Sequence, residues 1–164
     1  TLLGNGPLKG RLAELAEKLG VDVSFDFLPK EKLIKKLQQS DLYVHSATVE
    51  IEAIAAIEAI ACGLVPVIAE SSLSATRQFA LNEKSLFKDN NAKELAAKID
   101  YWFEHPSERA LMSGRYAVFA KKFSLKNSLA LAEQMFADEI SDYSARKLQQ
   151  NASPFPRFSL FTRA

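Results

Sequence analysis

Two glutamates, Glu50 and Glu58, are the residues whose type and spacing best suit ligand chemistry. Glu58 lies within residues 53–61, whose other members are all alanine or isoleucine. A carboxylate placed among apolar side chains is costly unless it has a hydrogen-bonding partner. Ribose hydroxyls suit this role, because one carboxylate accepts from two neighbouring hydroxyls. A ribose is therefore a candidate ligand for Glu58.

The elements around this pair place it at the usual binding edge of a parallel sheet. Residues 42–44 are predicted as a short apolar strand, with His45 and Ser46 at its carboxyl end. The following loop carries Glu50 and leads into a helix at residues 53–61. Ligands of open parallel sheets bind outside the carboxyl ends of the strands, and a helix amino terminus offers N–H groups to a diphosphate. Together these features predict a nucleotide-sugar site.

Strands and helices alternate along the chain up to about Phe87, which predicts a parallel sheet covered by helices. Apolar periods of two predict strands, and apolar positions three or four apart predict helices. The predicted strands are residues 2–3, 21–28, 42–44, 65–69 and 85–87. The predicted helices are residues 8–19, 31–39, 53–61, 92–104, 107–121 and 125–149. We therefore expect an α/β fold, a Rossmann-like parallel sheet with helices on both faces and extra C-terminal helices.

The expected organisation is a nucleotide-sugar-binding domain at residues 1–140, followed by a helix end and extended tail at residues 141–164. The strand at residues 2–3 has no helix before it, and the chain begins with Thr1. We therefore expect the domain to lack its first strand and helix, and the chain to be part of a longer protein.

Composition limits the classes of ligand and compartment. The 164 residues carry a formal net charge of +1, so no global field favours nucleic acid, and none is expected as a partner. The single cysteine, Cys62, excludes a disulfide within the chain and a cysteine-rich zinc site. The sequence has no Asp-x-Asp pattern, and neither a metal nor a cofactor is expected. The lack of a signal peptide or long apolar span favours a cytoplasmic protein.

The segment with the glutamate pair resembles a known family. Glu50 and Glu58 are followed, at residues 59–69, by Ala-Ile-Ala-Cys-Gly-Leu-Val-Pro-Val-Ile-Ala. This is similar to the signature of retaining glycosyltransferases of family four, in the carboxy-terminal, donor-binding domain of their two-domain GT-B architecture. Residues 4–7, Gly-Asn-Gly-Pro, and residues 42–46 match further landmarks, and the resemblance covers roughly residues 1–140.

The resemblance implies a role for each matching position. Glu50 would contact hydroxyls of the donor sugar and Glu58 the ribose, and these two are the implied catalytic residues. Backbone groups of residues 51–54 would approach the diphosphate, and Phe27 and Leu28 would flank the base. The implied donor-binding residues are Gly4, Gly6, Phe27, Leu28, His45, Ser46, Ile51, Glu52, Ala53, Ile54 and Glu58. The implied chemistry is front-face transfer with retention, dominated by electrostatic stabilisation of the leaving diphosphate.

Two features depart from the family pattern. Glu52 and Ala53 stand where many members have Phe-Gly, whose glycine lets the backbone approach the donor. The family's Arg and Lys clamp on the diphosphate, like its acceptor-binding domain, would precede this chain. The resemblance therefore implies that the chain alone binds donor weakly and transfers little. A structural role for His45 and a solvated role for Glu52 stay open as alternatives.

The expected acceptor follows from a narrower likeness. Glu52, Ala53 and residues 72–80 resemble bacterial enzymes that glucosylate membrane lipids such as diacylglycerol or sterols. This implies transfer of glucose from UDP-glucose to a lipid acceptor held by the preceding, amino-terminal domain. Two alternatives stay open: a saccharide or polysaccharide acceptor, and a non-catalytic nucleotide-sugar-binding module.

Two basic segments bear on membrane contact. Four lysines between residues 30 and 36 form a cluster that is either a solvated helix face or a contact with anionic lipid. The tail mixes basic and aromatic residues, namely Arg157, Phe158, Phe161 and Arg163. We therefore expect a cytoplasmic protein, with peripheral contact at the inner face of the cell membrane.

Overall fold

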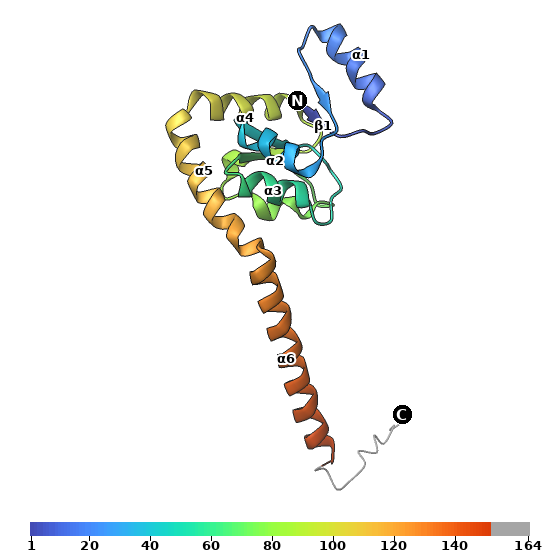
Figure 1. Cartoon of the computed structure of the whole chain (residues 1–164), viewed down its shortest axis with the longest axis vertical. Coiled ribbons are helices and arrows are strands. Elements are labelled where there is room, and N and C mark those ends of the chain that lie inside the picture. The colour runs from blue at the N-terminus through green and yellow to red at the C-terminus, as the bar shows by residue number, and fades with distance from the viewer. Residues whose placement is uncertain (152–164) are drawn as a thin grey trace, which may run out of the picture. The chain divides into compact units, whose positions relative to one another are not determined.

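The computed structural model describes residues 1–151 and divides into two compact units, Thr1–Lys121 and a second unit that begins at Lys122. Strands alternate with helices along the first unit (Figure 1). Its elements are β1 (Leu2–Leu3), α1 (Lys9–Leu19), β2 (Phe25–Asp26), α2 (Lys30–Gln38), β3 (Leu42–His45), α3 (Ile54–Ala61), β4 (Val65–Glu70), the 3₁₀ helices η1 (Ala75–Phe79) and η2 (Glu83–Ser85), β5 (Leu86–Lys88), α4 (Ala92–Glu104) and α5 (Pro106–Ala120). The 3₁₀ turn η3 (Lys121–Phe123) precedes α6 (Leu125–Asn151).

The five strands of the described residues pair in parallel and form two sheets. β1 pairs with β2, with Leu2 opposite Phe25. β3, β4 and β5 form the second sheet in that order, with His45 at the end of β3 opposite Ile68. The α/β fold with parallel strands and flanking helices, predicted from the alternation of elements, is what the chain adopts.

The core of the first unit surrounds β4. Residues 65–69 of this strand are all buried, as a continuous apolar run predicts for a strand covered on both faces. Helix α3 packs on β4 and on α5, and its residues Ala56, Ala59 and Ile60 are fully buried. Strand β3 pairs with β4, so this core fixes both elements that flank the loop at residues 46–53.

Two predicted helix ends are confirmed. Gly63 follows α3 with a φ of 83°, a left-handed conformation that favours glycine. A Cβ at this position would meet Ser113 Oγ at 3.1 Å, so close packing favours glycine as well. Asn91 caps α4, because its side-chain oxygen accepts a hydrogen bond from the Glu94 N–H at 3.0 Å.

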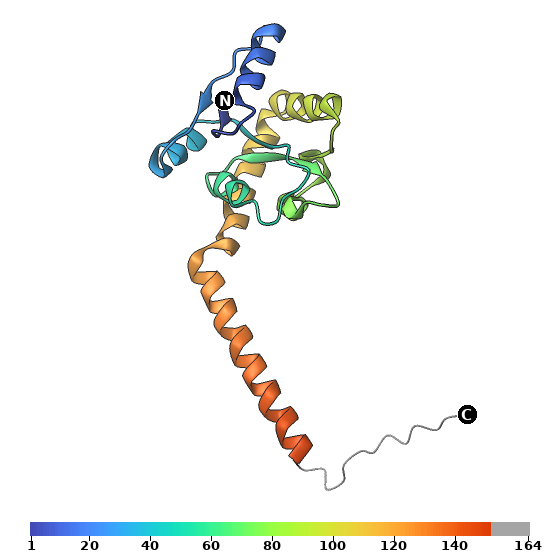
Figure 2. The ribbon, with the colours of Figure 1, turned by 90° about the vertical axis from the view of Figure 1, so that its right-hand side faces the viewer.

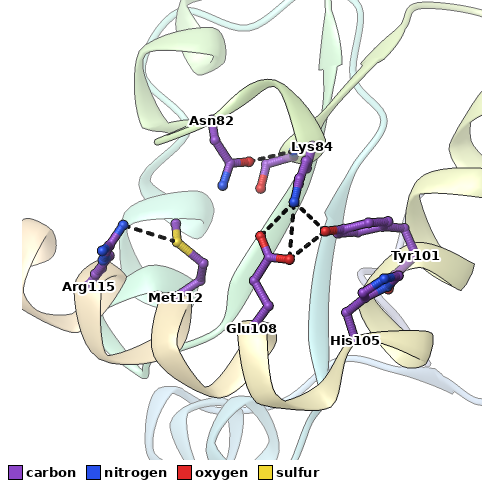
Figure 3. Close-up of polar contacts among 8 residues, drawn as sticks. Asn82, Lys84, Tyr101, His105, Glu108, Met112 and Arg115 are labelled. Atoms are coloured by element: carbon purple, nitrogen blue, oxygen red, sulfur yellow. Dashed lines mark hydrogen bonds and ion pairs between the residues drawn. The ribbon is translucent and has the colours of Figure 1, made fainter.

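Polar contacts connect η2 with α4 and α5 (Figure 3). Lys84 Nζ donates to Glu108 Oε1 at 2.8 Å and also to the Tyr101 hydroxyl. Tyr101 donates to Glu108 in turn, and its ring stacks on His105 with the ring centroids 4.1 Å apart. Hydrogen bonds from Lys84, and then from Tyr101, lower the pKa of Glu108. The group joins three elements of the first unit, and His105 takes part in it as the residue between α4 and α5.

One predicted strand is wrong in length. Residues 21–28 alternate as a strand would, yet β2 contains only Phe25 and Asp26. Among the described residues its strand partner is β1, which has two residues, so the pairing ends with them. Val21 is 53% exposed and Phe27 78% exposed, whereas Val23 and Phe25 between them are half-buried. The bounds of the other predicted elements agree with the structure to within two residues.

Helix α1 forms where it was predicted, but its apolar face has no buried residue. Leu12, Leu15 and Leu19, which share one face of the helix, are all exposed. Periodicity therefore predicted the helix, and its apolar face is exposed in the structure.

The second unit consists mainly of α6, one uninterrupted helix of 27 residues (Figure 2). Its large apolar side chains, including Leu129, Phe136 and Ile140, are exposed. Across residues 1–151, no helix combines the length and the apolar character that crossing a bilayer requires. The predicted domain boundary at residue 140 falls inside α6 and stays a prediction. The predicted tail, with its basic and aromatic side chains from Arg157 to Arg163, lies outside the described residues.

Candidate functional site

The loop between β3 and α3 is anchored through the backbone of Glu50. The Glu50 N–H donates to the Leu73 carbonyl at 3.2 Å, and the Ala75 N–H donates to the Glu50 carbonyl at 3.0 Å. These bonds form a parallel bridge between Glu50 and Ser74. Leu73 and Ser74 directly precede η1 and Ala75 begins it, and η1 packs on β4. The position of Glu50 is therefore set by a segment far along the chain.

The carboxylate of Glu50 is held by the backbone of its own loop. Its Oε1 accepts hydrogen bonds from the N–H groups of Ile51 at 3.0 Å and Glu52 at 3.3 Å. Hydrogen bonds from the backbone of Ala53, and then of Glu52, lower the pKa of this carboxyl group. Glu50 is therefore ionised at neutral pH and can accept hydrogen bonds from ligand hydroxyls.

This arrangement changes which backbone groups are available to an anion. The family resemblance implied that the backbone of residues 51–54 approaches a diphosphate, but Glu50 already occupies the N–H groups of Ile51 and Glu52. Helix geometry leaves the first N–H groups of α3, those of Ile54 and Ala55, without an intrahelical partner. These two groups are the ones that the helix start can offer to a phosphate.

Ala53, directly before α3, has a left-handed backbone with φ 51° and ψ 52° and is 5% exposed. This conformation costs a residue with a Cβ about 1–2 kcal/mol. The family pattern that the sequence resembles has glycine at this position. The structure supplies a physical reason for that glycine, because the chain must pass through a left-handed conformation to enter α3.

Substitutions at residue 53 test this strain. We expect Ala53→Gly to change the free energy of unfolding by less than about 1 kcal/mol, because relief of strain offsets the lost methyl burial and the added unfolded-state entropy. Ala53→Val should destabilise by at least about 2 kcal/mol, since a β-branched side chain at positive φ adds strain and overpacking. Urea unfolding followed by circular dichroism measures both variants. Equal destabilisation by the two would contradict a backbone limit at this position.

Glu58 lies on α3 and lines a cavity of about 660 Å³ together with Ser46, Ala55 and residues of β1 and β3. Its side chain is 20% exposed and pairs with Lys30 Nζ at the start of α2. Lys30 itself is 65% exposed, so the lysine side of the pair faces solvent. A carboxylate has several lone pairs, and this contact leaves acceptor positions for ligand hydroxyls.

His45 is buried at the end of β3 and contacts two polar side chains. Its Nδ1 lies 3.0 Å from the Tyr43 hydroxyl, and its Nε2 lies 3.9 Å from Glu50 Oε2. Burial lowers the pKa of His45, and the Glu50 carboxylate opposes this change. Burial, followed by the charge of Glu50, raises the pKa of Tyr43 to about 12. His45 is therefore neutral at neutral pH, and Tyr43 keeps its proton.

The structure brings some of the predicted site residues together and leaves others apart. Ser46 lines the cavity with Glu58, and His45 and residues 51–53 surround Glu50. Gly4 and Gly6 line a separate cavity of about 320 Å³ beside the start of α1. Phe27 is exposed and Leu28 half-buried, and neither lines the cavity that contains Glu58.

Sequence reasoning missed two residues at this site. Lys30 was grouped with the other lysines of its helix, and its contact with Glu58 depends on how α2 and α3 pack. Tyr43 was read as an apolar strand residue. Its spacing of two from His45, which places both side chains on one face of a strand, was the available signal. Within the described part of the chain, no group of three or more His, Cys, Asp or Glu side chains is placed to hold a metal ion.

Comparisons with known proteins agree with this fold. Residues 1–117 match the family described as glycosyl transferases group 1. The chain belongs to this family. A similar solved structure is the catalytic domain of the cholesterol-alpha-glucosyltransferase from Helicobacter pylori, which is 53% identical, with a TM-score of 0.72 over 75% of this chain and 79% of that chain. A search of curated proteins found no significant match.

Family membership indicates that the protein is a transferase, which moves a sugar from a nucleotide-sugar donor to an acceptor. The parallel strands with flanking helices are the Rossmann-like fold of a GT-B enzyme, which confirms the predicted fold class.

Proposed function

We propose that this glycosyltransferase transfers glucose from UDP-glucose to a membrane lipid, with retention of configuration. The observation that carries the proposal is the 53% identity to a cholesterol-alpha-glucosyltransferase over most of both chains. In UDP-glucose the sugar is α-linked to the diphosphate, so an α-glucoside product keeps the configuration of the donor. We place the enzyme in family four, with this chain as its carboxy-terminal donor-binding domain.

The proposed donor site consists of Glu50, Glu58 and the start of α3. The ionised Glu50 accepts hydrogen bonds from hydroxyls of the glucose, and Glu58 accepts them from the ribose. The N–H groups of Ile54 and Ala55 face the diphosphate at the positive end of the helix. As the C1–O bond to UDP breaks, the acceptor hydroxyl oxygen bonds to C1 and its proton passes to the leaving phosphate oxygen, while the helix start stabilises the diphosphate. We propose no metal and no other cofactor for this step.

An enzyme that acts on a membrane lipid must contact the membrane surface. We propose that this contact is peripheral and lies at the cytoplasmic face. Helix α2 also carries Lys32, Lys35 and Lys36, which do not pair with Glu58. We propose that these three lysines contact anionic lipid. Assays with detergent-dispersed sterol and with soluble saccharides separate this proposal from a saccharide acceptor. Transfer to soluble saccharides alone would overturn the lipid assignment.

The first experiment is a calorimetric titration of the complete protein with UDP and with UDP-glucose. We expect UDP to bind and UDP-glucose to bind more tightly, because only the second ligand reaches Glu50. In an NMR titration, backbone chemical-shift changes that saturate with UDP should map to residues 54–58, and those specific to UDP-glucose should extend to Glu50. Failure of the complete protein to bind either ligand would contradict the proposal.

A further inference from the structure

Tyr43 and His45 form a connected pair behind Glu50 that the proposed function does not yet use. They are two positions apart in β3, so their side chains lie on the same face of the strand. The two rings are 6.0 Å apart between centroids, and the Tyr43 hydroxyl lies 3.0 Å from His45 Nδ1. His45 is only 9% exposed, so its ring has one fixed environment.

The proton positions of this pair follow from electrostatics. A neutral imidazole has one N–H group and one acceptor nitrogen. His45 Nε2 is buried and has no hydrogen-bond partner among the described residues, and it faces Glu50 Oε2 at 3.9 Å. If Nε2 were the acceptor, its lone pair would face a negative carboxylate. The favoured arrangement has Tyr43 O–H donating to Nδ1 and the His45 Nε2–H pointing at Glu50.

The carboxylate of Glu50 is constrained on its other side. Oε1 is bonded to the N–H groups of Ile51 and Glu52, which fixes that oxygen against the loop. Oε2 is the oxygen that faces His45. At 3.9 Å the contact is a charge–dipole interaction, longer than a hydrogen bond. Such contacts often tighten when a ligand binds.

We propose that Tyr43 and His45 are positioning residues that hold Oε2 of Glu50 toward the hydroxyls of the donor sugar. Tyr43 O–H fixes the tautomer of His45, and the Nε2–H of His45 orients the carboxylate. Both residues act on the sugar through Glu50 in this arrangement. Tyr43 also lines the cavity that contains Glu58, so affinity for UDP is measured alongside affinity for UDP-glucose. The inference rests on the proposed function, in which Glu50 contacts the sugar.

The test is Tyr43→Phe in the complete protein, with calorimetric titration of UDP and of UDP-glucose. This variant keeps the ring and removes only the hydroxyl that fixes the tautomer. We expect affinity for UDP to stay within about twofold, and affinity for UDP-glucose to fall about three- to tenfold, as loss of one hydrogen bond allows. Tyr101→Phe is the matched control, because it removes a bonded hydroxyl from the group with Lys84 and Glu108. It should leave both affinities unchanged.

A double-variant cycle with Glu50→Gln separates positioning from a general structural role. If Tyr43 acts through Glu50, Tyr43→Phe should have no further effect on UDP-glucose affinity in the Glu50→Gln background. The same fold-change in both backgrounds would overturn the inference. If the unmodified protein binds UDP-glucose no better than UDP, the assignment of Glu50 to the sugar fails, and the inference fails with it. If it does prefer UDP-glucose and Tyr43→Phe keeps that preference, only the inference fails.

Substitutions of His45 give a second readout that does not depend on Tyr43. A glutamine amide nitrogen reaches approximately the position of Nε2, whereas an asparagine amide reaches only that of Nδ1. We expect His45→Gln to keep UDP-glucose affinity within about threefold and His45→Asn to lose as much as Tyr43→Phe. Equal losses in the two variants, with unchanged UDP affinity, would contradict a role for the Nε2–H.

Discussion

Replacing Glu58 with alanine is expected to lower the affinity for UDP about 10- to 100-fold, which corresponds to about 1.4–2.8 kcal/mol. The physical reason is the loss of hydrogen bonds from ribose hydroxyls to a carboxylate, each of which contributes about 1.5–3 kcal/mol. Glu58 is suited to this role because it lines the cavity beside Ser46 and its side chain is 20% exposed. Isothermal titration of the complete protein with UDP measures the effect.

Two controls separate loss of the ribose contact from other consequences of the substitution. Glu58→Ala also removes the ion pair with Lys30, and Lys30→Met removes the same pair while keeping the carboxylate. Solvent-facing pairs contribute less than about 1 kcal/mol, so neither variant should unfold the protein. Lys30→Met should keep UDP affinity within about threefold, because the carboxylate is still present. A loss as large as that of Glu58→Ala would assign the effect to the ion pair.

Glu50→Ala provides the complementary comparison for the sugar. We expect this variant to bind UDP nearly as well as the unmodified protein and to lose most of the additional affinity for UDP-glucose. The two glutamates would then act on different parts of one ligand, consistent with their separate surroundings near His45 and near Lys30. If both alanine variants bind UDP and UDP-glucose unchanged, the assignment of this site is wrong.

The elements that sequence predicts well are those whose own residues determine them. Helix α4 begins and ends where the pattern placed it, because Asn91 caps it and Pro106 follows it. Strand β4 was recognisable because a strand buried on both faces must be apolar throughout. Strand β2 was not, because its length depends on β1, a partner of two residues elsewhere in the sequence.

In the candidate site, too, features set by local residues were predictable and features set by distant residues were not. The pattern predicted a loop carboxylate at Glu50 and a helix carboxylate at Glu58, and the structure has this arrangement. What holds Glu50 in place could not be deduced, because residues 73–75 bind its backbone from a distant part of the chain. The left-handed backbone of Ala53 was hidden for a related reason, since alanine carries no sequence signal for positive φ. The pairing of Tyr43 with His45 needed only local spacing, but its direction toward Glu50 needed the anchored loop.

Trp102→Ala is expected to lower the free energy of unfolding by about 3–5 kcal/mol, the range for removing a large aromatic side chain from a core. Trp102 is fully buried on α4, which packs on β4, β5 and α5. Its indole ring meets the Tyr101 ring edge-on, with centroids 5.2 Å apart at an interplanar angle of 81°. Domains of this size are stable by only about 5–15 kcal/mol, so the variant should unfold at much lower urea concentration. Equilibrium urea unfolding measures the shift.

Trp102→Phe shows how much of that loss comes from volume. The indole Nε1 is buried and has no hydrogen-bond partner among the described residues, so the native side chain includes an unsatisfied donor. Phenylalanine keeps most of the apolar contact and removes the donor, whose burial costs about 1–3 kcal/mol. The smaller ring leaves a cavity that opposes this gain, so the net cost of Trp102→Phe should stay below about 2 kcal/mol. A loss as large as that of Trp102→Ala would contradict the expected gain from removing an unsatisfied donor.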